Sequence, residues 1–201
     1  MVAKTDVVIV GHGPSLLRRG LGEEIDKYFT VRLKRCQDTL KLPLIYGSRV
    51  DALCGSWTIR EGLKAIPAKE YWTFVDSRHA TVDVADWDGV VNKALCDDWN
   101  QRFRAARTPY RRIDGTVLCA SSDEGLGHNH LSAGFHAILY ACELGAKVVR
   151  LAGFDNVVSG NFTWSVTRGR DYRTYPDHRW DIEHQMLPLV ETSYGVKICA
   201  L

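Results

Sequence analysis

Short apolar runs alternate with stretches of helical periodicity along this chain. The first run, Val7–Val10, is wholly apolar and rich in β-branched residues, which is typical of a strand buried on both faces of a parallel sheet. It leads into a turn that contains two glycines. Further strands are predicted on similar grounds at residues 28–33, 50–54, 71–75, 116–120, 147–152 and 196–199.

Two longer segments carry apolar residues at the spacing of one helix face. The first is 132–144, after which Gly145 is a C-cap signal, and the second is 180–191. Strands that alternate with helices predict an α/β fold, here a single Rossmann-like domain over residues 1–201 with a mostly parallel sheet. Because ligands of such sheets bind beyond the carboxyl ends of the strands, the strand ends are the candidate sites.

The composition of the 201-residue chain is that of a globular protein, with 45% hydrophobic and 25% charged residues. Its 26 basic and 24 acidic residues leave a formal charge of +2, too small for wholesale electrostatic binding of nucleic acid or an anionic membrane. The residues before Gly11 are too few and too polar for a signal peptide or a membrane span, so we expect a cytoplasmic protein. The six cysteines lie far apart without a C-x-x-C pair, which favours reduced core residues over disulfides.

The first strand ends in the turn Gly11–Ser15. Two glycines let the backbone approach a ligand, and a following helix start offers N–H groups and a positive dipole to phosphate. The dinucleotide fingerprint G-x-G-x-x-G is incomplete, because Leu16 stands at the third glycine. The turn therefore suits a phosphate, although a plain tight turn explains the same residues.

A second candidate turn precedes the helix of 132–144. Ser132 is a plausible N-cap and Gly134 follows it, so N–H groups again converge on one position, although capping of its own helix alone explains Ser132 equally well. His128 and His130 nearby lack a third ligand and the helical spacing of a zinc site. We therefore predict no metal at this turn.

The third strand end leads into a long polar and aromatic loop, 159–176, which delivers His178 to the start of a helix. A neutral imidazole takes a proton from an attacking hydroxyl at neutral pH, and Glu183 is suited to orienting this region. We therefore predict His178 as a general base. The alternative is an ordinary capping or surface histidine.

Together these segments resemble the sialyltransferases, both the animal-type family and the smaller bacterial enzymes. Residues 7–16 look like the nucleotide-binding segment of the bacterial enzymes, in which Asn usually stands at the position of His12. The long sialyl motif of the animal-type family, in which the residue corresponding to Lys34 is normally a nucleotide-binding Asn, is similar to segments 22–26, 31–33 and 47–51.

Two further motifs of the family have counterparts in the second half of the chain. Residues 131–134 and the stretch through 145–155 look like the short sialyl motif, whose glycine turn contacts the donor. His178 and Glu183 fit the H-x-x-x-x-E pattern, in which the histidine is the catalytic base. The resemblance covers about nine-tenths of the chain, in the family's order.

The resemblance implies a variant of the glycosyltransferase GT-A fold and an inverting, metal-independent transferase without a cofactor. The donor would be a CMP-sugar, carrying sialic acid or a related sugar, and the acceptor a hydroxyl of a glycan or another molecule. The catalytic residues would be His178 as base, Glu183, and Tyr172 and Tyr175 beside the leaving phosphate. The implied donor-binding residues are Gly11, His12, Gly13, Pro14, Ser15, Lys34, Ser132, Ala133, Gly134, Gly153 and Asp155.

Three alternatives to this interpretation stay open. The arginine-rich stretch 102–112, with Tyr110 interleaved, suits an anionic glycan, nucleic acid or a solvated helix face, so a transferase that modifies a hydroxylated DNA base is one of them. The second is a nucleotide-binding module that has lost turnover. The third is a metal-dependent transferase, since Asp86 and Asp88 match the short Asp-x-Asp pattern.

Overall fold

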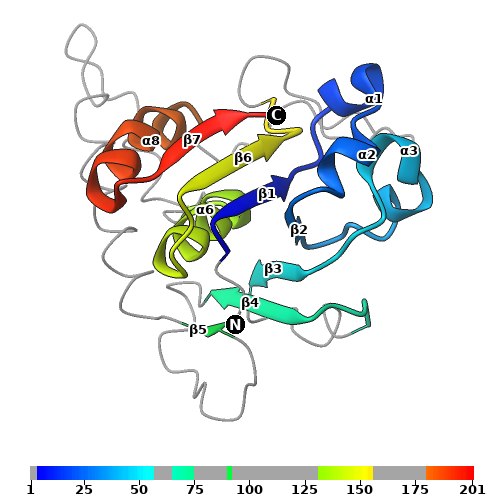
Figure 1. The fold of residues 1–201 in the computed structure, drawn as a ribbon, viewed down its shortest axis with the longest axis horizontal. Coiled ribbons are helices and arrows are strands. Elements are labelled where there is room, and N and C mark those ends of the chain that lie inside the picture. The colour runs from blue at the N-terminus through cyan, green and yellow to red at the C-terminus, as the bar shows by residue number, and fades with distance from the viewer. Residues whose placement is uncertain (1–3, 57–64, 75–89, 92–130, 156–179) are drawn as a thin grey trace, which may run out of the picture.

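A parallel β-sheet forms the centre of the computed structural model, which describes residues 4–56, 65–74, 90–91, 131–155 and 180–201. Within these residues the sheet has seven strands in the order β5-β4-β3-β2-β1-β6-β7 (Figure 1). The hydrogen-bonding register of every neighbouring pair is parallel. The α/β fold with a mostly parallel sheet is thus confirmed. The strands are β1 (Asp6–Val10), β2 (Phe29–Leu33), β3 (Ala52–Ser56), β4 (Glu70–Phe74), β5 (Val90–Val91), β6 (Val148–Ala152) and β7 (Lys197–Ala200).

Helices pack on both faces of this sheet. One face is covered by three short helices, α1 (Ser15–Arg19), α2 (Gly22–Ile25) and α3 (Pro43–Tyr46), together with the 3-10 turn η1 (Thr39–Lys41). The longer helices α6 (Ala133–Glu143) and α8 (Trp180–Tyr194) pack on the other face.

The central position of β1 explains why its sequence is apolar throughout. Val7 and Ile9 belong to the core under α6, whereas Val8 and Val10 belong to the core under α1, α2 and α3. All four side chains are at most 2% exposed. A central strand with a helical layer on each face cannot alternate between apolar and polar positions, because successive side chains point to opposite faces.

Most of the predicted elements are present, with small shifts at their ends. Strand β3 begins two residues later than predicted; just before it, the carboxylate of Asp51 accepts the backbone N–H of Thr30, and the Asp51 N–H donates to the Thr30 carbonyl. Helix α8 continues to Tyr194, and Gly145, at φ 91°, follows α6 as predicted. The predicted strand 116–120 lies outside the described residues. The helix start predicted after the turn 11–15 is present as α1, whereas the short helices α2 and α3 were not predicted as elements.

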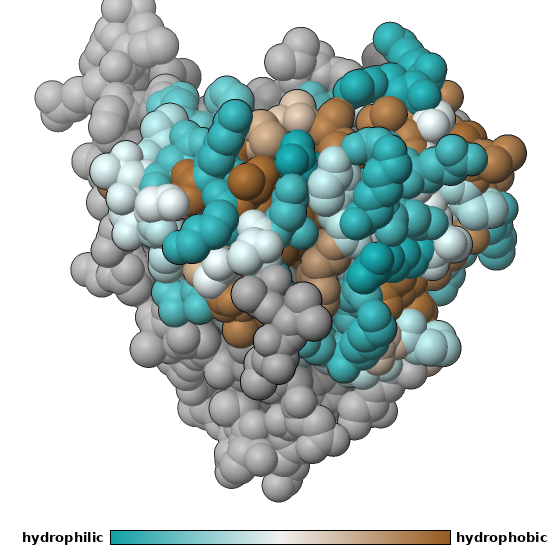
Figure 2. Space-filling model, viewed as in Figure 1, coloured by the Kyte–Doolittle hydropathy of each residue, from teal (hydrophilic) through white to brown (hydrophobic). Residues whose placement is uncertain are grey.

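The surface at the α1 and α3 end carries exposed apolar side chains. Leu17, Leu42 and Leu44 are exposed there, and Figure 2 shows hydrophobic residues among hydrophilic ones at this end of the molecule. Among the described residues, no helix combines the length and the apolar character needed to cross a membrane.

The strand order creates a switch point between β1 and β6. From β1 the chain builds outward through β2, β3, β4 and β5, and then returns to add β6 and β7 on the other side of β1. Connections leave the carboxyl ends of β1 and β6 in opposite directions, which opens a crevice for ligands in sheets of this type. The residues after these two strands, 11–15 and 153–155, are therefore the candidate site.

Candidate functional site

The turns after β1 and β6 are held together by backbone hydrogen bonds. The Gly11 N–H donates to the Ala152 carbonyl at 2.8 Å, and the Gly13 N–H donates to the Gly153 carbonyl, also at 2.8 Å. A Cβ atom at either Gly11 or Gly13 would lie 2.5 Å from the Gly153 oxygen. Glycine is thus required here by the approach of the two backbones, not only by the approach of a ligand.

Asp155 holds the start of α1. Its carboxylate accepts the backbone N–H of Ser15, while Pro14 at the N-cap position provides no side-chain acceptor. A carboxylate supplied from the end of β6 therefore replaces the missing cap. The Ser15 N–H, which the sequence suggested for phosphate, is bonded within the protein, as are the Gly11 and Gly13 N–H groups, so His12 is the residue of this turn whose N–H is in none of the described hydrogen bonds.

Phe154 joins these turns to the N-terminus of α6. A Cβ atom at Gly11 would lie 3.2 Å from Phe154 Cδ2, and one at Gly134 would lie 2.8 Å from Phe154 Cε1. The ring therefore packs against both glycines at once. Three of the predicted segments, 11–15, 132–134 and 153–155, are thus brought together, and Ala133 begins the helix at this point.

Ser132 and Glu183 connect α6 to α8. The Glu183 carboxylate accepts the Ser132 backbone N–H at 2.5 Å and the Ser132 hydroxyl at 2.8 Å. The same hydroxyl oxygen accepts the Phe135 N–H at 3.2 Å, as expected of an N-cap. Both residues are buried, at 9% and 7% exposure. Ser132 is therefore an N-cap and also the anchor for the first turn of α8.

The catalytic residues predicted from the sequence are only partly covered by the structure. Glu183 lies at the α6 N-terminus, where it orients Ser132. His178, Tyr172 and Tyr175 lie outside the described residues.

His12 lies between the ends of β1 and β2. Its Nε2 is 3.0 Å from the Lys34 carbonyl oxygen, and since a carbonyl only accepts, Nε2 carries the hydrogen. Burial is the main cause of a lowered His12 pKa. The hydrogen bond to the Lys34 carbonyl raises the pKa, and the positive charges of Arg32, Arg35 and Lys34 lower it further. The ring is thus neutral near pH 7, with Nδ1 as a buried acceptor that has no hydrogen-bond partner among the described residues.

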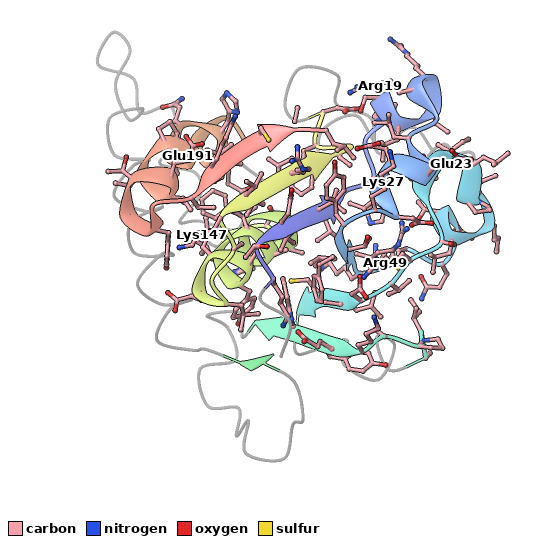
Figure 3. All side chains as sticks on the ribbon, viewed as in Figure 1. Arg19, Glu23, Lys27, Arg49, Lys147 and Glu191 are labelled. Carbon is pink, nitrogen blue, oxygen red and sulfur yellow. The ribbon has the colours of Figure 1, made fainter. Side chains whose placement is uncertain are left out.

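The buried side chain of Arg32 connects β2 to the segment 46–49. Arg32 is fully buried and donates from Nε to the Arg49 carbonyl at 2.9 Å and from Nη2 to the Tyr46 carbonyl at 2.7 Å. The Asp26 carboxylate accepts the Ser48 and Arg49 N–H groups of the same segment, and Figure 3 shows Arg49 beside β3. Asp26, Arg32 and Arg49 belong to the motif-like segments 22–26, 31–33 and 47–51. Their contacts with one another were not predicted from the sequence.

No group of three or more His, Cys, Asp or Glu side chains suited to a metal ion occurs within the described ranges. Asp86, Asp88, His128 and His130 lie outside them. The described residues therefore neither support nor test a metal at those positions.

Comparison with solved structures finds sialyltransferases. The monofunctional α-2,3-sialyltransferase Cst-I from Campylobacter jejuni is 15% identical, over 100% of this chain and 77% of that chain, with a TM-score of 0.57. CstII from Campylobacter jejuni, in complex with cytidine 5′-monophosphate, is 14% identical over 100% of this chain and 81% of that chain, with a TM-score of 0.52. No protein-family model and no curated protein sequence matches the chain. The similarity predicted from the motifs is thus confirmed at the level of the fold: this chain has the fold of the sialyltransferases.

Proposed function

We propose that this protein is an inverting glycosyltransferase that transfers sialic acid or a related sugar from a CMP-sugar to an acceptor hydroxyl. The observation that carries the proposal is the pair of hydrogen bonds between Glu183 and Ser132, 51 residues apart in sequence. They join the helix that follows His178 to the turn proposed for the donor. The shared fold with CstII, which was solved with CMP, supports the choice of nucleotide.

The donor site of this proposal lies beyond the carboxyl ends of β1, β2 and β6. Within the turn 11–15 the phosphate would be contacted by the His12 N–H, because Gly11, Gly13 and Ser15 donate within the protein and Pro14 has no N–H. Residues 132–134 would face it from the N-terminus of α6, whose dipole favours an anion. His12 and Lys34 would line the β2 side, and Gly153 with Asp155 the β6 side.

His178 acts as the general base in the proposed reaction. Its imidazole takes the acceptor hydroxyl proton as the oxygen bonds to the anomeric carbon. The bond from that carbon to the phosphate oxygen breaks at the same time, so the configuration inverts and CMP leaves with the electron pair. Tyr172 or Tyr175 would donate a hydrogen bond to the leaving phosphate, in place of a metal ion. Glu183 is a positioning residue, because both carboxylate oxygens are engaged by Ser132.

A nucleotide panel and one variant test this function. A ligand that binds only the folded state raises the melting temperature, so CMP should raise it more than UMP, GDP or NAD at equal concentration. The wild type should consume CMP-sialic acid, and His178→Ala should reduce kcat by about 100- to 10,000-fold with little change in CMP affinity. Preference for another nucleotide would refute the donor assignment. CMP binding without any turnover would identify a nucleotide-binding module instead.

A further inference from the structure

The three residues that follow β6 hold different parts of the candidate site. The Gly153 carbonyl accepts the Gly13 N–H at 2.8 Å, and the Asp155 carboxylate accepts the Ser15 N–H. Both of these bonds go to the turn after β1. Phe154, which lies between the two residues in sequence, contacts this turn and also the first turn of α6.

The Phe154 ring faces a glycine on each side. Its Cδ2 carbon would lie 3.2 Å from a Cβ atom at Gly11. On the other side, Cε1 and Cζ would lie 2.8 and 3.2 Å from a Cβ atom at Gly134. Cδ2 and Cε1 are diagonally opposite carbons of a phenyl ring, so the ring fills the space between the two backbones. Its width therefore sets the separation of the turn after β1 from the start of α6.

Backbone N–H groups on both sides of the ring are open to a ligand. The His12 N–H, beside Gly11, takes part in none of the described hydrogen bonds, and the same holds for the Ala133 and Gly134 N–H groups at the start of α6. Such N–H groups have no partner within their own helix. A ligand that accepts from both elements at once needs them at one particular separation.

We infer that Phe154 is a positioning residue, which fixes the separation of these two elements and through it the affinity for the donor. This inference rests on the proposed function, in which the donor phosphate lies between the turn 11–15 and residues 132–134. The ring supplies no hydrogen bond of its own. It acts through the backbone N–H groups on either side, because a change in its size moves one set of groups relative to the other.

Phe154→Leu tests the inference by shortening the side chain on one side. Leucine keeps carbons as far as Cδ, the level that faces Gly11, and lacks the Cε1 and Cζ carbons that face Gly134. The start of α6 then loses its support. In a calorimetric titration well below the melting temperature, we expect Phe154→Leu to bind CMP about tenfold more weakly than the wild type, because hydrogen bonds to a phosphate are charge-assisted and depend on geometry.

Gly134→Ala supplies a compensating change. The new methyl group would occupy the space that Cε1 and Cζ of Phe154 leave, and the next atom near it, Ser132 Oγ at 3.6 Å, is at ordinary contact distance. The double variant Phe154→Leu/Gly134→Ala should therefore bind CMP within about threefold of the wild type. Gly11→Ala cannot serve in this way, because its Cβ would lie 2.5 Å from the Gly153 oxygen whatever residue stands at 154.

Phe29→Leu is the matched control. Phe29 packs against the same hydrophobic core as Phe154 and is also partly buried, but it begins β2 at the amino end of the sheet, away from the switch point. Its replacement should lower the melting temperature, as the loss of packed ring carbons does, and leave the CMP affinity unchanged. A residue that serves only the fold would behave in the same way.

Three results would overturn the inference while the proposed function survives. One is wild-type affinity for CMP in Phe154→Leu, whatever its melting temperature. Another is a double variant that binds CMP no better than Phe154→Leu does. The third is an equal loss of CMP affinity in Phe29→Leu. Failure of the wild type to bind CMP would instead overturn the proposed function, and this inference with it.

Discussion

Replacing Glu183 by glutamine tests the connection between α8 and α6. The carboxylate accepts two hydrogen bonds from Ser132, one on each oxygen, at 2.5 and 2.8 Å. A glutamine amide has one oxygen and one NH₂ group, so it can accept only one of them. Either the Ser132 N–H loses its acceptor, or the Ser132 hydroxyl turns away or accepts from the new NH₂ group, although the side chain at 183 keeps almost the same shape.

The expected loss of stability follows from this change. Two hydrogen bonds to a charged group, each worth about 1.5–3 kcal/mol, are replaced by one neutral bond of about 1 kcal/mol. Removal of a buried charge recovers part of the difference, because the carboxylate no longer has to be desolvated. We therefore expect Glu183→Gln to lower the free energy of unfolding by about 2 kcal/mol, which lowers the melting temperature by about 4–8 °C.

Urea unfolding of Glu183→Gln, Ser132→Ala and the double variant measures this coupling. Because both single changes remove the same interaction, the double variant should be more stable than the sum of the two losses implies, by about 1 kcal/mol. Glu191→Gln, also in α8, is a matched control: the Glu191 carboxylate accepts the Ile198 N–H at 2.7 Å, and an amide oxygen can still accept this bond. Additive losses, or equal losses at Glu183 and Glu191, would refute the reasoning.

The remaining predictions concern the turn, a histidine and metal dependence. Gly13→Ala should cost about 2–4 kcal/mol in urea unfolding, because the new Cβ would lie 2.5 Å from the Gly153 oxygen. Gly145→Ala has nothing within 4 Å of its Cβ and should cost only the backbone strain of its φ of 91°, about 1–2 kcal/mol. Since burial lowers the pKa of His12, only the unfolded chain takes up its proton near pH 6.5, so stability should fall from pH 7 to pH 5 in the wild type and fall less in His12→Asn; parallel pH curves would contradict this. Turnover should persist in EDTA, and loss restored by manganese would favour a metal mechanism.

Some features of this fold depend on local patterns and could be predicted from the sequence. A strand with core on both faces must be apolar at every position, so β1 was recognisable from four residues. The N-cap Ser132 and the glycine after α6 are also local signals, because they satisfy or redirect the backbone within one turn. The short helices α2 and α3 were not recognised, because helices of four residues have too few positions to show a period.

The candidate site shows what the tertiary structure decided. The bond from Ser15 to Asp155 spans 140 residues, and the bonds from Ser132 to Glu183 span 51. No local pattern contains such pairs, because their geometry depends on strand order and on the packing of α6 and α8. Sequence alone identified the residue types suited to a phosphate and a proton. Only the parallel sheet, with its switch point between β1 and β6, brings the described ones to one edge and assigns Asp155 and Glu183 to holding backbone N–H groups.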